Sequence, residues 1–279
     1  MGGRRITDGS TTRAVRIGSH YAATPARGPS DSISVTTRPS GLSIVVPLFD
    51  EEDGVERLLA ALRPVVATLD SRRDVEVILV DDGSRDRTLT KLRAAVGDGD
   101  PRWRVLAHER NRGLTTALRT GTDAAAQPLC AWLDADLSYD PAILLELCAA
   151  LDAGADCATA SCHAPGGRIE GVPPLRGWLS RQASRCYRIA TGRRLSTFTC
   201  MVRAQRRDLL LRTWPERAGF LGVTEQMLRV LESGARVVEV PATLRARTTG
   251  RSKLRVLRVI RAHLGLIRAA RRGLGVANS

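Results

Sequence analysis

Long apolar runs are absent from this 279-residue sequence, and no stretch approaches the roughly 20 uncharged residues that a membrane-spanning helix needs. The first forty residues also lack an apolar run long enough for a signal peptide. The six cysteines include no CxxC pair and no histidine at metal-ligand spacing, which argues against a zinc site. We therefore expect a globular protein, soluble or peripheral to a membrane, with buried free thiols in a reducing cytoplasm.

Aromatic residues are scarce, at 4%, and only two lysines accompany 41 arginines. The formal net charge of +14 comes from the two ends of the chain. Residues 1–40 carry a net +4, and residues 241–279 carry ten basic residues and no acidic one, whereas residues 41–240 contain 27 residues of each sign. A neutral body with few aromatics and no recognition motif argues against nucleic acid as the partner.

Apolar runs typical of strands alternate with helical patterns along the middle of the chain. The run LSIVVPLF (42–49) predicts a buried strand, and the apolar spacing in 54–69 predicts the helix after it. The alternation continues through strands at 75–84, 104–108 and 128–137 and helices at 88–96 and 114–125. This order predicts a Rossmann-like α/β fold, with a doubly wound, mostly parallel sheet flanked by helices.

Three of the predicted strands end in acidic residues, in the stretches PLFDEE, VDDGS and LDADL. The carboxyl ends of parallel strands meet at one edge of a sheet, where ligands bind. Asp134 and Asp136, at i and i+2, would point the same way, about 7 Å apart. Such carboxylates select a hard cation, Mg²⁺ or Mn²⁺. The other ligands of such an ion are commonly phosphate oxygens, so we expect a nucleotide diphosphate to bind here. For any single strand, the alternative to a ligand site is that the acidic residues only cap the helix that follows.

Five motifs in register give a more specific indication. The series VVPLFDEED, VILVDDGSRDRT, NRGLTTALRTG, AWLDADLSYDP and RTTGRSKL resembles the family 2 glycosyltransferases of GT-A fold, in particular the dolichyl-phosphate mannose synthases and their bacterial polyprenyl-phosphate relatives. The resemblance covers residues 41–254. It implies a metal-dependent, inverting transfer of a sugar from a nucleotide diphosphate sugar to a polyprenyl phosphate.

The resemblance also implies roles for single residues on the donor side. Pro47, Phe49 and Glu51 would line the pocket for the base and the ribose. Asp81 and Asp82 match the strand-end acids that hydrogen-bond the nucleoside. Pro47 and Phe49 also have simpler explanations, since a proline can end a strand and a phenylalanine can merely pack.

Further matches concern the metal and the phosphates. Asp134 and Asp136 match the DxD pair, which holds Mg²⁺ or Mn²⁺ against the diphosphate. Arg176, Arg247 and Lys253 would bind phosphate groups of donor or acceptor, with a solvated basic turn as the alternative for the last two. There are two more candidates: Arg181 would assist at the phosphates, and Glu225 would either position a sugar hydroxyl or orient an arginine.

The acceptor side departs from the subgroup's pattern. Cys162 replaces an arginine, His163 replaces an aromatic residue, and Thr197 replaces a glycine that allows close backbone approach. Either Arg168 supplies the missing cation, or the acceptor differs from a polyprenyl phosphate. With a hydroxyl acceptor on a small molecule or a glycan, His163 could act as general base, although a surface histidine without a role is the simpler interpretation. A non-catalytic scaffold that binds sugar nucleotides is a further alternative.

We divide the chain into a disordered lead-in (1–40), a GT-A catalytic domain (41–254) and a basic amphipathic helix (255–279). Residues 253–272 combine helical apolar spacing with arginines on the other side. They would lie on an anionic membrane surface or pack on the domain with a solvated basic face. We expect a cytoplasmic protein, peripheral at the cytoplasmic membrane face, which could also need a membrane-anchored protein partner.

Overall fold

The structure, a computed structural model, describes residues 40–97, 99–246 and 256–274. Residues 1–39, expected to form most of the lead-in, lie outside this part, as do Arg247 and Lys253. For Arg176 and residues 256–260 only the backbone is described.

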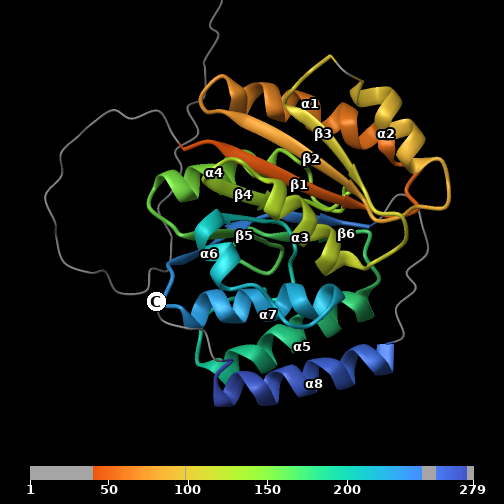
Figure 1. Ribbon diagram of the computed structural model, residues 1–279. Helices are drawn as coiled ribbons and strands as arrows, with labels where there is room; N and C mark the ends of the chain where they lie inside the picture. Colours follow the sequence, from red (N-terminus) through yellow and green to blue (C-terminus); the bar gives the residue numbers. More distant parts are fainter. Residues whose placement is uncertain (1–39, 98, 247–255, 275–279) are drawn as a thin grey trace, which may run out of the picture. The chain divides into compact units, whose positions relative to one another are not determined.

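A seven-stranded sheet forms the centre of the described fold (Figure 1). Its strands stand in the spatial order β3-β2-β1-β4-β7-β5-β8. Every neighbouring pair is parallel except those of β7, which runs antiparallel to both β4 and β5. A separate parallel pair joins β6 to β9. The strand bounds are β1 Leu42–Leu48, β2 Val75–Asp81, β3 Trp103–Ala107, β4 Leu129–Trp132, β5 Cys157–Ser161, β6 Arg168–Glu170, β7 Arg203–Arg206, β8 Val237–Pro241 and β9 Thr243–Arg245.

Helices cover both faces of this sheet, which confirms the doubly wound prediction. Alternate side chains of β1 point to opposite faces, so Ile44 and Val46 pack with α1, α2 and α4, whereas Val45 packs with α3, α6 and α7. β1 and β2 are buried on both faces, which explains their continuous apolar sequences. The helix bounds are α1 Val55–Asp70, α2 Thr88–Val96, α3 Leu114–Ala124, α4 Ile143–Asp152, α5 Pro174–Thr191, α6 Arg207–Arg212, α7 Gly219–Glu232 and α8 Val256–Arg272.

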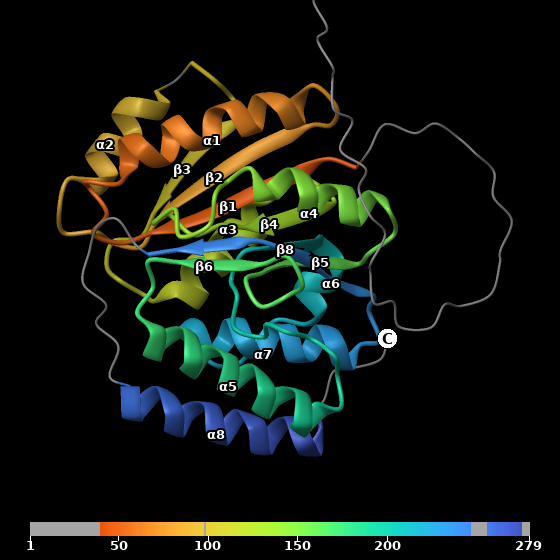
Figure 2. The same cartoon turned by 180° about the vertical axis from the view of Figure 1, so that it is seen from behind.

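The last helix, α8, packs against α5 and α7 (Figure 2). Leu266 is fully buried and Ala270 nearly so, in one cluster with Tyr187 of α5. The hydroxyl of Tyr187 lies 2.7 Å from Nδ1 of His263. This packing favours the second of the two alternatives for residues 253–272, a helix held on the domain with its arginines in solvent. No helix in the described ranges is both long enough and apolar enough to cross a membrane.

Candidate active site

The three acidic strand ends meet as the sequence predicts. β2, β1 and β4 are adjacent and parallel, and Leu48 at the end of β1 pairs with Asp81 at the end of β2. The acids that follow β1 and β4 therefore leave the sheet at the same edge as Asp81. Two non-glycine residues of the described chain have a left-handed φ, Asp50 (54°) and Leu137 (55°), and they follow β1 and β4 at this edge. Such conformations cost of order 1 to 3 kcal/mol and cluster at functional sites.

Asp81 is fully buried and keeps one carboxylate oxygen without a partner. Its Oδ2 accepts a hydrogen bond from the backbone N–H of Ser84 (3.1 Å), but its Oδ1 meets no donor among the described residues. Buried polar atoms are nearly always satisfied, so each exception calls for an explanation. This unsatisfied oxygen lies at the end of β2, on the acidic edge of the sheet.

Asp82 is also buried, but its oxygens are used within the protein. Oδ1 accepts from the backbone N–H of Arg112 (2.9 Å) and lies 2.7 Å from Nδ1 of His108, while Oδ2 accepts from the backbone N–H of Gly113 (2.8 Å). Nε2 of His108 in turn lies 2.9 Å from the hydroxyl of Thr120 on α3. Asp82 thus holds the loop between β3 and α3 in place, whereas the resemblance gives it a direct contact with the nucleoside.

The turn after β2 approaches this loop so closely that only glycine fits. Gly83 has a φ of +69°, and a Cβ at this position would lie 2.2 Å from the backbone carbon of Arg110. His108, Arg110 and Arg112 line an open hollow at the end of β3, next to Asp81 on the neighbouring strand. The sequence interpretation missed His108, although its place at the end of a predicted strand was a usable signal.

The loop after β1 is tied to the loop after β2. The backbone N–H of Asp50 donates to the hydroxyl of Ser84 (3.0 Å), and that of Glu51 donates to Thr88 (2.9 Å). Phe49 and Glu51 are half-buried at this edge. Pro47, in contrast, lies within β1 opposite Val80. The three residues proposed for the base and ribose pocket thus share one end of one strand with the acids.

Asp134 and Asp136 lie in the loop after β4 and are both half-buried. Oδ1 of Asp136 accepts a hydrogen bond from the backbone N–H of Ser138 (2.9 Å), which fixes the turn. No group of three or more His, Cys, Asp or Glu side chains in the described ranges could hold a metal ion by itself. Two carboxylates fit a Mg²⁺ or Mn²⁺ ion that takes its remaining ligands from phosphate and water.

On the acceptor side, the residues that depart from the family pattern are largely enclosed. Cys162 is buried, and the hydroxyl of Thr197 lies 2.8 Å from that of Ser161 at the end of β5. The carboxylate of Glu239 accepts the backbone N–H of Thr197 (2.9 Å). Arg168, a possible substitute for the missing arginine, is exposed in β6. Thr197 is therefore held inside the protein.

His163 has a ring nitrogen without a partner. Its Nδ1 is buried and unpaired within the described residues, while Nε2 lies 3.4 Å from the hydroxyl of Ser180 on α5. Burial, and secondarily the positive charge of Arg181, lower the pKa of His163 below its usual value of about 6.5. The imidazole is therefore neutral at pH 7 and able to accept a proton.

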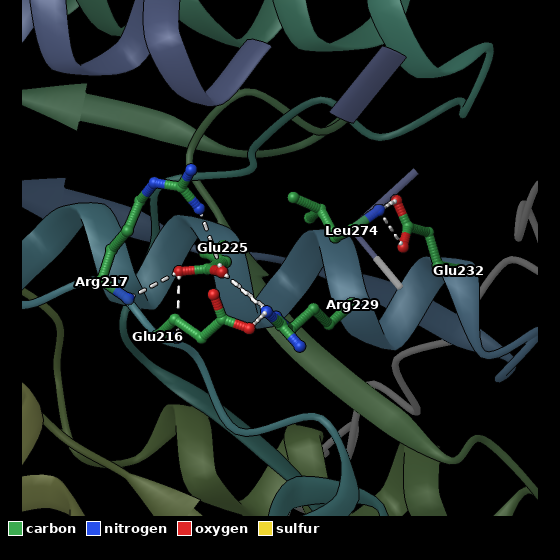
Figure 3. Close-up of polar contacts among 6 residues, drawn as sticks. All are labelled: Glu216, Arg217, Glu225, Arg229, Glu232 and Leu274. Carbon is green, nitrogen blue, oxygen red and sulfur yellow. Dashed lines mark hydrogen bonds and ion pairs between the residues drawn. The ribbon is translucent and has the colours of Figure 1, made fainter. Parts of the chain in front are cut away.

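Glu225 lies midway along α7 and is the buried centre of a charge network that reaches back to the turn before this helix (Figure 3). Its Oε2 accepts the backbone N–H groups of Glu216 (3.2 Å) and Arg217 (2.8 Å). Its Oε1 pairs with the guanidinium groups of Arg217 and Arg229, both at 3.1 Å. With this many donors the carboxylate orients arginines, which is the second of the two roles that the sequence left open, rather than positioning a sugar hydroxyl. The sequence interpretation missed both arginines, because their pairing with Glu225 depends on the turn before α7.

Of the remaining candidates, Arg176 lies in the first turn of α5, and Arg247 and Lys253 lie outside the described residues. Five of the six cysteines are buried and none forms a disulfide, which confirms the expectation of free thiols.

The model of the family described as glycosyl transferase family 2 matches residues 43–214. The chain belongs to this family. Family membership confirms the resemblance on which the enzyme class was predicted. The match covers the strands and loops that carry the acidic edge, from β1 through the end of β7.

Relatives with known names come from several organisms. An undecaprenyl-phosphate 4-deoxy-4-formamido-L-arabinose transferase of Pseudomonas fluorescens is 31% identical over 81% of this chain and 64% of its own length. A polyprenol monophosphomannose synthase of Mycolicibacterium smegmatis is 30% identical over 78% of this chain and 83% of its own. A dolichol-phosphate mannosyltransferase of Pyrococcus furiosus is 28% identical over 77% of this chain and 59% of its own. The chain thus spans about two thirds or less of two of these relatives.

Solved structures confirm the GT-A fold. A glucosyl-3-phosphoglycerate synthase from Mycobacterium tuberculosis, in complex with Mn²⁺, UDP and phosphoglyceric acid, matches with a TM-score of 0.64 at 18% identity. The match covers 85% of this chain and 80% of that one. At this identity the similarity concerns the fold alone.

Proposed function

We propose that this protein is a metal-dependent, inverting glycosyltransferase that moves a sugar from a nucleotide diphosphate sugar to a polyprenyl phosphate. The observation that carries the proposal is the convergence of the acids after β1, β2 and β4 at one edge of the sheet. The names of the three relatives, all transferases for a polyprenyl-type or dolichol phosphate, support this acceptor class.

On the donor side, the unpaired Oδ1 of Asp81 would accept an N–H group of the base. Asp82 acts indirectly, because it holds the loop of His108 and Arg112 that lines the hollow beside it. Asp134 and Asp136 would hold Mg²⁺ or Mn²⁺, which would neutralise charge on the departing diphosphate. Phe49 and Glu51 would complete the nucleoside pocket.

On the acceptor side, a lipid phosphate is already an oxyanion near neutral pH and needs no strong general base. The full engagement of Glu225 by its donors fits this expectation. Positioning and charge stabilisation would then carry most of the rate enhancement. Arg176, Arg247 and Lys253 are our candidates for the phosphate contacts. Such an acceptor also requires that the protein work at a membrane surface, on its cytoplasmic face in our proposal.

One observation favours a second candidate, transfer to a hydroxyl acceptor. His163 is neutral at pH 7 and its buried Nδ1 has no partner among the described residues, while Cys162 stands where the subgroup has a cation. A hydroxyl nucleophile needs a base, and a neutral imidazole can serve as one.

Two experiments test these proposals. First, purified protein is heated with UDP, GDP, CDP, ADP or dTDP, with and without Mn²⁺, and the melting temperature is measured. Stabilisation by one diphosphate that requires the metal is expected, and no shift with any of them would contradict the donor half.

Second, membranes, polyprenyl phosphate and the matching radiolabelled nucleotide sugar are incubated with the protein, and the product is partitioned between butanol and water. Label in the organic phase is the expected result. A water-soluble product would favour the hydroxyl acceptor, and binding without any product would favour the scaffold alternative.

A further inference from the structure

The helix α5 presents an apolar stripe to solvent. Among the described residues, five large apolar side chains are strongly exposed, and three of them lie on α5: Leu175 (67%), Trp178 (56%) and Ile189 (68%). Their separations of 3 and 11 residues are close to whole helical turns, so the three share one side of the helix. Water-exposed apolar surface of this kind marks an interaction site more often than scattered single residues do.

Arginines flank this stripe. Arg181, Arg185 and Arg188 are exposed, and α5 contains no acidic residue. Within the described part of the chain, none of the three forms an ion pair with a carboxylate. The adjoining helix α8 adds further exposed arginines and also lacks acids: Arg261, Arg268, Arg271 and Arg272. The two helices together form a surface of one charge sign.

We infer that the outer face of α5 is a docking surface for an anionic lipid bilayer. Trp178, Leu175 and Ile189 enter the headgroup layer, where tryptophan is favoured, and the flanking arginines bind lipid phosphates. Of the apolar residues of α8, Leu266 and Ala270 are buried against the domain and brace α5, whereas Leu264 is 46% exposed. The proposed contact is centred on residues 174–191, which carry three of the five strongly exposed apolar side chains of the described residues, and not on the segment 253–272 that the sequence pattern indicates.

Other occupants fit this face less well. A nucleic acid would pair with the arginines but would leave the apolar stripe in water. A second copy of the chain would bring two arginine-rich, acid-free faces together, and like charges across an interface oppose association. The inference goes beyond the proposed function and does not depend on it, since lipid binding requires no sugar transfer.

The test is co-sedimentation of the full chain with vesicles of phosphatidylglycerol and phosphatidylcholine, compared with phosphatidylcholine alone. Arg185→Glu changes the charge of α5, and Arg93→Glu makes the same change on an exposed arginine of α2, on the other side of the sheet. Each charge near an anionic surface contributes about 1 kcal/mol, so Arg185→Glu should bind roughly 30-fold more weakly, and Arg93→Glu should bind like the wild type. Equal binding by both variants would overturn the inference.

Tryptophan fluorescence gives an independent readout. Trp178 is the one tryptophan of the four that is more than half exposed, since Trp103 and Trp132 are buried and Trp214 is partly buried. Anionic vesicles should shift the emission to the blue, and Trp178→Ala should abolish the shift and weaken binding. An unshifted spectrum would contradict the inference. So would binding to duplex DNA that Trp178→Ala leaves unchanged, or a dimer in light scattering that this variant dissociates.

Discussion

Two neighbouring aspartates of the same strand end should respond differently to one chemical change. Asp81→Asn should leave the free protein as stable as before, because one oxygen suffices to accept the N–H of Ser84. Asp82→Asn should destabilise the protein. The two oxygens of Asp82 accept the backbone N–H groups of Arg112 and Gly113, and in the variant the NH₂ group would face one of these two donors.

The expected magnitudes follow from these contacts. A buried donor without an acceptor costs about 1–3 kcal/mol, so Asp82→Asn should lower the melting temperature by roughly 2–6 °C in a chain of this size. For Asp81, the lost contact is a charge-assisted hydrogen bond to the nucleoside, at about 1.5–3 kcal/mol. The dissociation constant for the nucleotide should therefore rise roughly 10- to 150-fold.

Differential scanning fluorimetry measures both quantities, with the free protein for stability and a nucleotide titration for affinity. The two variants are matched controls for each other, since each exchanges one carboxylate for an amide at adjacent positions. If Asp81→Asn melts as low as Asp82→Asn and binds nucleotide normally, the assignment of Asp81 to the nucleoside is refuted.

Three further outcomes follow from the structure. Asp136→Asn should abolish metal-dependent turnover while the melting temperature stays within a degree or two, and retained activity would remove the metal from the proposed mechanism. Glu225→Gln should lower the free energy of unfolding in urea by about 3–5 kcal/mol, because it leaves Arg217 and Arg229 partly unpaired. A loss smaller than that caused by Asp82→Asn would contradict the role of Glu225 as the centre of this network. Burial lowers the pKa of both His163 and His263, so the unfolded chain binds protons first as the pH falls. Stability should thus decline below about pH 6.5, and His263→Gln should flatten that decline.

Much of the fold followed from local pattern. β1, β2 and β4 are short apolar runs bounded by acids and turns. Their alternation with helices predicts a parallel sheet. Parallel strands place their carboxyl ends together whatever the loops do, so the meeting of Asp81 with the acids after β1 and β4 was predictable. The antiparallel course of β7 between β4 and β5 was not, because pairing partners far apart in the chain decide it.

The sequence by itself determined the doubly wound fold, the acidic edge and the family, since each depends on residues close together in the chain. Only the tertiary structure determined which contacts each of these acidic residues makes. Asp82 holds a loop 30 residues away, whereas Oδ1 of Asp81 meets no donor in the described ranges, and Glu225 is enclosed by Arg217 and Arg229. The contact of His263 with Tyr187, 76 residues away, is part of the packing that holds α8 on the domain, while the stripe on α5 stays in solvent. Amphipathic patterns show that a helix has an apolar side, but only packing determines what covers it.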